Sequence, residues 1–296
     1  MILPVTDQTP GDVRRHYDDL DVIYREIWGD HVHHGYWRTG KETQAEAVVA
    51  LVALVAARLQ LSAGQKICDI GCGYGASALY LAEHHNVAVT GLTISPAQAR
   101  IAAGLRPSTG RFVCLERDWL ANGLPDRSFD HAYAIESSEH MVDKPMFFTE
   151  AWRTLRPGGR LAVCAWLAAE RPSPLSVRYL LEPICREGRL PGMCNREEYV
   201  DMARQAGFSL VQFADISGKV RRTWSICARR LAMKFLADAH FRAMIADPEL
   251  RDRIFLLTVA RLMIALRTGA MRYGMFTWQR RATSHDRTSD QSRGVA

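Results

Sequence analysis

The sequence predicts an α/β protein built on a mostly parallel sheet. Short apolar segments alternate with helical ones between residues 66 and 166, and right-handed crossovers then make successive strands parallel. The first strand, 66–70, runs into Gly71, Gly73 and Gly75, a spacing that lets backbone approach a ligand closely. With 296 residues, 48% of them hydrophobic, the chain can form one large domain with a cap.

The elements of the sheet follow in order along the chain. Residues 11–60 are expected to be helical, apart from a break at 33–40 that contains glycines and aromatic residues. Helices are expected to separate the strands, and the turn Pro157-Gly158-Gly159 to precede the fifth of them. The five expected strands are 66–70, 87–91, 111–115, 131–135 and 160–166.

Beyond Trp166 the pattern changes. Helices are expected at 174–187 and at 196–206, the second with Asn195 as its N-cap, followed by a strand at 209–215. Residues 220–268 are almost wholly helical in pattern, with apolar positions at helical spacing that predict a packed face. These positions are Leu231, Phe235, Leu236, Ile254, Leu257, Val259, Leu262, Met263 and Leu266. The last strand is expected at 271–278 and is expected to return to the edge of the sheet.

The glycine loop leaves two cofactors open. Gly71-x-Gly73-x-x-Ala76 also fits the dinucleotide fingerprint, which needs an acidic residue roughly 20 residues further on for the ribose. The second strand instead runs into Leu92-Thr93-Ile94-Ser95-Pro96, which contains no acid. Asp69 stands directly before the glycines, where a carboxylate would face the positive α-amino and sulfonium region of S-adenosylmethionine. An acid directly before the glycines, and none after the second strand, favours S-adenosylmethionine over a nicotinamide cofactor.

Five segments carry a family resemblance: 28–37, the glycine loop, 91–98, 135–141 and 155–160. They resemble the class I S-adenosylmethionine-dependent methyltransferases, and within them the γ-tocopherol C-methyltransferase-like group. Segments 91–98 and 135–141 are also similar to cyclopropane fatty acid synthases. The resemblance implies a Rossmann-like, mostly parallel seven-stranded sheet. It further implies an N-terminal helical lid at 1–60, a methyltransferase domain at 61–282 with a helical cap around 220–268, and a disordered tail at 283–296.

The resemblance also implies a set of cofactor-binding residues at the carboxyl ends of the strands. Thr93 and Gln98 would take over recognition of the ribose from the missing acid. Asp118 would accept a hydrogen bond from the adenine amino group, and Trp119 would cover the adenine face, unless the indole is simply part of the core. The full expected set is Asp69, Gly71, Gly73, Gly75, Thr93, Gln98, Asp118, Trp119 and Glu136.

The reactive segment is expected at Glu136-Ser137-Ser138-Glu139-His140. Methyl transfer needs an aligned and deprotonated nucleophile, and His140 is suited to remove a proton near neutral pH. Glu139 would orient His140, bind a substrate hydroxyl or hold an anion, and Glu136 would face a polar group of the substrate or the methionine end. The alternative is that Glu139 or His140 only caps the next helix.

The acceptor pocket is expected to be aromatic. Trp166 stands where related sugar O-methyltransferases can carry an acid, which suggests a flat apolar acceptor, and Trp224 lies in the expected cap. His34, Tyr36 and Trp37 are expected in a lid over the pocket. No metal is expected, because three histidines within four residues (His31, His33, His34) do not readily converge on one ion. Arg221 and Arg222 would suit an anionic substrate.

Composition restricts the partners. The net charge of +6 is dispersed rather than gathered into a stripe, so nucleic acid is not expected. Seven scattered cysteines indicate reduced thiols, with Cys72 packed under the cofactor. The longest apolar stretch, 45–61, is too short to span a membrane, and the first residues lack a secretory pattern, so the cytoplasm is expected. The expected partner is a small-molecule acceptor, with a homodimer as a further state.

These expectations describe a small-molecule methyltransferase that acts at carbon on an aromatic or prenylated natural product. Oxygen or nitrogen methylation comes next, followed by methylation of a terpene diphosphate. Two other classes remain open: a nicotinamide oxidoreductase, which would need an acid or Arg where Thr93 stands, and a non-catalytic S-adenosylmethionine-binding protein, which would not need Glu139 and His140.

Overall fold

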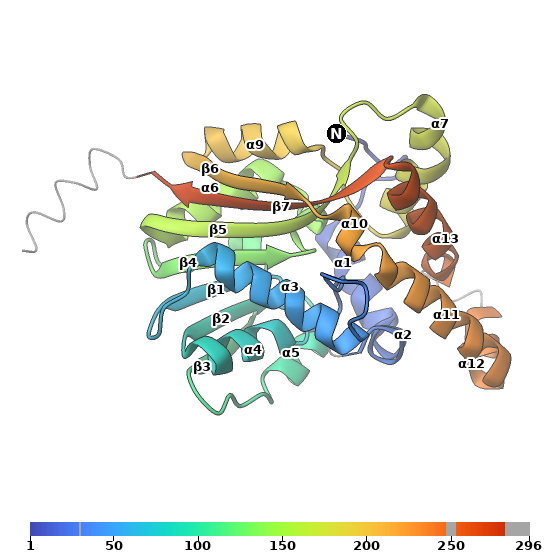
Figure 1. Cartoon of the computed structure of the whole chain (residues 1–296), viewed down its shortest axis with the longest axis horizontal. Helices are drawn as coiled ribbons and strands as arrows, with labels where there is room; N and C mark the ends of the chain where they lie inside the picture. Colours follow the sequence, from blue (N-terminus) through green and yellow to red (C-terminus); the bar gives the residue numbers. More distant parts are fainter. Residues whose placement is uncertain (30, 247–252, 282–296) are drawn as a thin grey trace, which may run out of the picture.

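A seven-stranded sheet forms the centre of the protein (Figure 1). The computed structural model describes residues 1–29, 31–246 and 253–281. The strand order is β3-β2-β1-β4-β5-β7-β6, in which the first five are parallel and β7 is antiparallel to both of its neighbours. The strands are β1 Lys66–Ile70, β2 Ala88–Thr93, β3 Arg111–Glu116, β4 Phe129–Ile135, β5 Leu155–Ala168, β6 Phe208–Asp215 and β7 Met271–Arg280. The predicted fold class is confirmed.

One strand differs from its expected bounds by more than two residues. β5 begins at Leu155, so it includes the Pro157-Gly158-Gly159 segment that was expected to be a turn before the strand. Gly158 has a φ of +79°, and the pairing of β4 with β5 shifts register between Phe129 and His131. The segment is therefore an irregularity inside the strand. The proline and glycines mark this irregularity and not the residue at which the strand begins.

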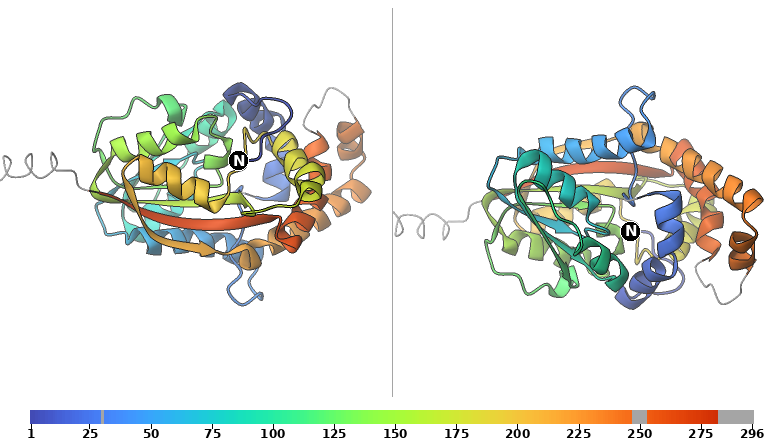
Figure 2. Two further views of the ribbon diagram at one scale, coloured as in Figure 1. Left: turned by 90° about the horizontal axis from the view of Figure 1, so that it is seen from above. Right: turned by 90° about the horizontal axis from the view of Figure 1, so that it is seen from below.

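Helices cover both faces of the sheet, as Figure 2 shows. On one face α3 (Gln44–Leu59) and α4 (Ala76–His85) pack on inward-facing residues such as Ile67 and Val89. On the other face α6 (Lys144–Thr154) and α9 (Arg196–Gln205) pack on residues such as Ile70 and Val163. Neighbouring residues of β1 alternate between these two cores, as pleated strands require. The result is a three-layer α/β/α arrangement.

A third apolar core lies at one end of the sheet, where the N-terminal and cap helices gather (Figure 1). Leu20, Ile27, Trp224, Phe241 and Leu262 are among its buried members. The contributing helices are α1 Pro10–Asp19, α2 Asp21–Ile27, α8 Glu182–Glu187, α11 Arg222–Ala237, α12 Ala239–Ala246 and α13 Arg253–Thr268. The remaining short elements are α5 Pro96–Ala102, α7 Pro174–Ser176, a π-helical turn Val177–Leu181, α10 Ser217–Val220, and 3-10 turns at Trp119–Ala121 and Ser138–His140.

Several helix predictions are confirmed in detail and two need correction. Asn195 caps α9 in a reciprocal capping box with Glu198. The break in the N-terminal helical region is longer than expected, because α2 ends at Ile27 and α3 begins at Gln44. Phe235 and Leu236, expected on the packed face of the cap, are 46% and 79% exposed. The side chains of residues 254 and 257 and the tail at 283–296 lie outside the described residues.

In the described ranges no helix is long and apolar enough to cross a membrane.

Candidate active site

The glycine loop follows β1, and its three glycines serve different ends. All three have positive φ values, +83° at Gly71, +54° at Gly73 and +84° at Gly75. A Cβ at Gly71 would collide with Ser137, and one at Gly75 would lie 2.8 Å from the Phe112 ring. A Cβ at Gly73 would meet nothing within 4 Å. Gly71 and Gly75 therefore permit close packing, whereas Gly73 leaves backbone open to a ligand.

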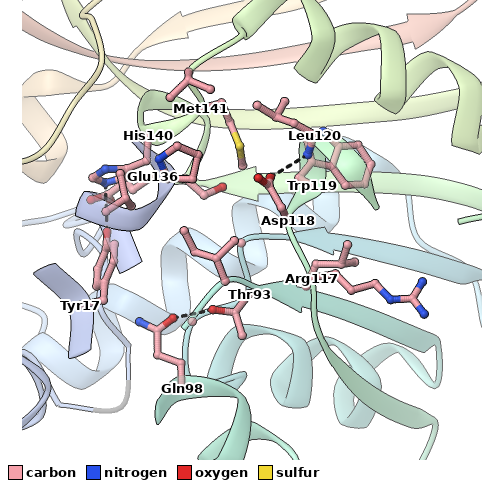
Figure 3. A pocket seen from close by; sticks show the side chains of 18 of the residues that line it. Tyr17, Thr93, Gln98, Arg117, Asp118, Trp119, Leu120, Glu136, His140 and Met141 are labelled. Atoms are coloured by element: carbon pink, nitrogen blue, oxygen red, sulfur yellow. Dashed lines mark hydrogen bonds between the residues drawn. The ribbon is translucent and has the colours of Figure 1, made fainter. Parts of the chain in front are cut away.

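The main cavity lies above this loop, at the carboxyl ends of the strands (Figure 3). It encloses about 780 Å³, part of which is open to solvent. Of the expected cofactor residues it contains Gly71, Gly73, Thr93, Gln98, Asp118, Trp119 and Glu136. The structure thus brings together seven of the nine, from loops that follow four different strands.

The far side of this cavity carries the residues expected to bind ribose and adenine. Thr93 donates its hydroxyl hydrogen to Oε1 of Gln98 at 2.8 Å, which fixes the amide beside the end of β2. Asp118 accepts from the backbone N–H of Leu120 at 2.9 Å. Trp119 is 1% exposed and donates its indole hydrogen to the Phe147 carbonyl. Trp119 is therefore core and cavity wall at once.

Asp69 does not line the main cavity. It is buried beside the glycine loop and borders a smaller hollow that it shares with His31, His33 and Tyr133. Burial raises the pKa of Asp69 to about 7, against the hydrogen bond at 2.6 Å that Tyr133 donates to the carboxylate. Gly75 is also absent from the main cavity, because it packs against Phe112.

Two of the three clustered histidines contact each other, and the third turns away from them. Nδ1 of His31 lies 3.2 Å from Nε2 of His33, and the same atom of His33 lies 3.1 Å from the hydroxyl of Ser77. His34 instead turns to Glu136. Across the part of the chain that the structure describes, no three His, Cys, Asp or Glu side chains are placed to hold a metal ion.

Glu136 stands at the centre of a dense hydrogen-bond network. Its φ is +54°, which is uncommon for a residue with a side chain and is typical of functional sites. The carboxylate accepts from the His34 backbone N–H at 2.7 Å, His34 Nδ1 at 2.9 Å, Tyr273 at 2.7 Å and Trp166 at 3.2 Å. Burial alone would raise the pKa, but His34 and the hydrogen bonds lower it to about 2. Glu136 is therefore a buried anion.

Glu139 behaves in the opposite way. It is 2% exposed and accepts from the Trp166 backbone N–H at 2.7 Å and from the Ser138 hydroxyl at 3.2 Å. Burial, reinforced by the charge of Glu136, raises the pKa of Glu139 to about 8. At neutral pH this side chain is mainly a carboxylic acid that can donate a hydrogen bond.

His140 is held between two partners. Nδ1 lies 3.3 Å from the Arg189 carbonyl, and Nε2 lies 3.0 Å from the hydroxyl of Tyr17. Burial, together with the electrostatic effect of the nearby His16 and Lys144 side chains, lowers the pKa of His140 to about 4. The imidazole is consequently neutral at physiological pH, which is the form that accepts a proton.

A second cavity of about 500 Å³ adjoins the first. Its walls include Trp28, Trp166 and Trp224, whose rings meet edge to face, with the Trp224 centroid 5.7 Å from each of the others. Both cavities are lined by Tyr17, Val32, Glu136 and His140. Trp166 and Trp224 thus lie where an acceptor pocket was expected, directly beside His140.

Three expected pocket residues lie elsewhere. His34 is 1% exposed and packs against Trp166, Trp224 and Tyr273, behind the second cavity. Tyr36 and Trp37 line neither cavity. Backbone hydrogen bonds from Tyr36 to Ala47 and from Trp37 to Lys219 join this segment to α3 and α10.

The cap arginines also point away from the site. Arg222 hydrogen-bonds to the Gly40 carbonyl, and its guanidinium lies 6.0 Å from the centroid of the Trp37 ring. Arg221 is exposed and, like Arg222, lines neither cavity. The expectation that these residues meet an anionic substrate is not met by their positions.

The structure also reveals site residues that the sequence did not single out. Pro10, Val13 and Tyr17 of α1 line the main cavity. Helix α1 is fastened to the β2 loop by a 2.6 Å hydrogen bond that Ser95 donates to Asp18. The only sequence signal at this point is the capping box of Thr9 and Asp12, which predicts a helix but not where it packs.

The fold and the site define a class I S-adenosylmethionine-dependent methyltransferase. The evidence is the strand order with its antiparallel β7, the open backbone at Gly73, and the Thr93, Gln98 and Asp118 side chains gathered over it. The chain belongs to the mycolic acid cyclopropane synthetase family, whose model matches residues 6–243.

Three relatives illustrate this membership. The chain is 34% identical over 230 residues to 27-O-demethylrifamycin SV methyltransferase of Amycolatopsis mediterranei (strain S699), covering 76% of this chain and 84% of that one. It is 27% identical to the chloroplastic tocopherol O-methyltransferase of Arabidopsis thaliana, covering 89% and 80%. The structure of mycolic acid cyclopropane synthase CmaA1 complexed with SAH and CTAB superposes with a TM-score of 0.80 at 22% identity, covering 93% and 99%.

Proposed function

We propose that this enzyme methylates a hydroxyl group of a flat, largely apolar natural product, with His140 as the general base. The observation that carries the proposal is the position of His140. Its neutral imidazole lies where the main cavity and the tryptophan-walled second cavity share their walls. A base at that junction can take a proton from an acceptor while the acceptor oxygen faces the cofactor.

The residues of the main cavity fit S-adenosylmethionine. Gly71 and Gly73 would lie against its methionine part, Thr93 and Gln98 would bind the ribose, and Asp118 would accept from the adenine amino group. When bound, the cofactor supplies an electrophilic methyl group on a positively charged sulfur. Glu136, the buried anion of this cavity, would complement that positive charge.

The two glutamates of the reactive segment would have separate tasks. Glu136 accepts four hydrogen bonds and is fixed in place, so it serves as a permanent negative charge. Glu139 lines the second cavity as a neutral acid, and can donate a hydrogen bond to an acceptor oxygen. Such a donor would orient the acceptor with the reacting hydroxyl toward His140.

Carbon methylation of a phenol is the second candidate. Three tryptophans wall the second cavity, and flat aromatic walls favour a ring-shaped acceptor. Deprotonation of a phenol by the same histidine activates the ortho and para carbons as well as the oxygen. Methylation at oxygen is favoured over methylation at carbon, because the names of the relatives from Amycolatopsis and Arabidopsis both refer to an oxygen atom.

The first test concerns the cofactor and needs no acceptor. Calorimetric titration with S-adenosylhomocysteine is expected to give micromolar binding, and titration with NADH is expected to give none. The second test incubates the enzyme and S-adenosylmethionine with a panel of phenols, prenylated phenols and macrocyclic alcohols. Mass spectrometry detects transfer, and NMR of the product distinguishes a methoxy group from a methyl group on carbon.

The base is tested by His140→Ala. Loss of turnover with unchanged S-adenosylhomocysteine affinity is expected. His84→Ala is the matched control, because His84 stacks on Tyr80 at the surface of α4 and lines neither cavity. Full turnover in His140→Ala would refute the base role while leaving the methyltransferase assignment intact.

A homodimer and a cytoplasmic location remain predictions from the sequence. Light scattering of the purified chain would determine the first, and cell fractionation the second.

A further inference from the structure

The hydroxyl of Tyr17 occupies the lone pair of the proposed base. Its oxygen lies 3.0 Å from Nε2 of His140, although the two residues are 123 positions apart. The other ring nitrogen, Nδ1, lies 3.3 Å from the Arg189 carbonyl. A carbonyl can only accept, so Nδ1 carries the imidazole hydrogen and Nε2 presents the lone pair. Tyr17 is therefore the donor in this hydrogen bond.

Tyr17 is also held firmly in this position. Its neighbour Asp18 accepts from Ser95 at 2.6 Å, and Asp21 of α2 accepts from the Tyr74 hydroxyl at 2.6 Å. The Tyr17 and His140 rings meet edge to face with centroids 5.5 Å apart. An acceptor that displaced Tyr17 would have to break some of these contacts. Proton transfer to His140 with Tyr17 left in place does not require these contacts to break.

The contact lies at the junction of the two cavities. Tyr17 and His140 each line both of them, and Figure 3 shows Tyr17 reaching from α1 toward His140. A hydroxyl group that enters from the tryptophan-walled side meets the tyrosine oxygen beside the imidazole. A phenol oxygen can accept a hydrogen bond while its own hydrogen is donated, so Tyr17 can stand between acceptor and base.

We propose, building on the function above, that Tyr17 relays the proton of the acceptor hydroxyl to His140. The acceptor proton moves to the Tyr17 oxygen as the phenol proton of Tyr17 moves to Nε2. The acceptor oxygen forms its bond to the methyl carbon, and the carbon–sulfur bond breaks with its electron pair left on sulfur. The imidazolium then loses its proton to water, and Tyr17 ends with one hydrogen, as it began.

The electrostatics of the site favour a concerted relay. Burial, with the nearby carboxyl groups of Glu139 and Glu136, raises the pKa of Tyr17 far above its ordinary value. A separate tyrosinate is therefore disfavoured, and the two proton shifts have to occur together. The groups facing His140 are Tyr17 and His16 of α1, Lys144 of α6, Glu136 and the Arg189 carbonyl.

The first test needs no acceptor. The ring of His140 is titrated by NMR in the wild type and in Tyr17→Phe, both with S-adenosylhomocysteine added. The wild-type hydrogen bond stabilises the neutral imidazole, so removing it is expected to raise the pKa of His140 by about one unit. An unchanged pKa would show that Tyr17 does not hold the lone pair in solution, and would overturn the proposal.

The second test uses the acceptor found in the screen. Tyr17→Phe is expected to lower kcat by about 100-fold, with little change in KM or in S-adenosylhomocysteine affinity. The rate is also measured in mixtures of H2O and D2O. Its dependence on the deuterium fraction is expected to fit two transferred protons in the wild type and one in Tyr17→Phe. Tyr74→Phe is the matched control, because it removes a similar tyrosine hydrogen bond to the N-terminal helices, the one to Asp21 of α2, and should keep the two-proton dependence.

The two proposals fail separately. If His140→Ala abolishes turnover while Tyr17→Phe retains wild-type kcat and the two-proton dependence, the base stands and the relay is refuted. If His140→Ala keeps full turnover, the base role itself is refuted and the relay with it.

Discussion

Glu136 and Glu139 lie three residues apart at the end of β4 and are oppositely protonated at neutral pH. The pKa of Glu136 is lowered to about 2, whereas that of Glu139 is raised to about 8. The difference arises from their donors. Glu136 is paired with His34 and receives further hydrogen bonds from Tyr273 and Trp166, while burial dominates at Glu139. One short segment therefore supplies both a fixed charge and a neutral donor.

The first prediction concerns stability. The folded protein keeps the Glu139 proton up to about pH 8, whereas an unfolded glutamate releases it near pH 4.3. The contribution of Glu139 to the free energy of unfolding is thus full below the unfolded pKa and is lost as the pH rises to 8. Glu139→Gln removes this pH dependence. The free energy of unfolding of the variant, relative to that of the wild type, should therefore be higher at pH 9 than at pH 5 by on the order of a few kcal/mol. Urea unfolding at both pH values measures this, and equal differences would contradict it.

The second prediction concerns activity. Neutral His140 is needed as base and neutral Glu139 as donor, so kcat/KM should form a plateau between an acidic limb near 4 and a basic limb near 8. In Glu139→Gln the basic limb should disappear, while the acidic limb stays. An acidic limb near 6.5, the ordinary value for histidine, would contradict the burial argument.

The third prediction concerns the cofactor loop. Gly73→Ala places a methyl group in the main cavity and should weaken S-adenosylhomocysteine binding at least about tenfold. Gly64→Ala is its control, because Gly64 also has a positive φ, +82°, and open space, yet lines neither cavity. Both variants should lose about 1 kcal/mol of stability, because each places an alanine in a left-handed backbone conformation. Calorimetry should show the affinity loss in Gly73→Ala alone.

The fourth prediction separates the second cavity from the segment once expected to line it. Trp224→Phe should raise the acceptor KM several-fold and leave S-adenosylhomocysteine affinity unchanged, because Trp224 lines only the second cavity. Trp37→Phe should leave both constants unchanged, since Trp37 is 3% exposed and bonds to the Glu42 carbonyl outside both cavities. Steady-state kinetics measures both variants. A raised KM in Trp37→Phe would contradict the prediction and indicate that Trp37 contacts the acceptor.

The sequence predicted best what lies at strand ends. The positions of Thr93, Asp118, Glu136 and Trp166 follow from strand periodicity and from the rule that parallel strands present their carboxyl ends at one edge. The order of the sheet beyond the fifth strand was not predicted. The last strand was expected at the edge of the sheet, but long-range packing places β7 between β5 and β6.

Side-chain direction was the part that local pattern could not give. His34 lies in the segment expected to be a lid, yet it turns inward because Glu136 accepts from both its backbone and its ring. Tyr17 was missed for the same reason, since its contact with His140 joins elements far apart in sequence. Asp69 was placed correctly beside the glycines, but Tyr133 draws its carboxylate away from the main cavity.

The hydrogen bonds to Glu136 come from the N-terminal segment, from β5 and from β7, which is the last strand of the sheet. Tyr273, one of these donors, is synthesised 137 residues after Glu136. Until then the carboxylate has only the donors of His34 and Trp166, and β5 lacks its neighbour β7. The hydrogen-bond network around Glu136 is therefore complete only after β7 has been synthesised and has paired with β5.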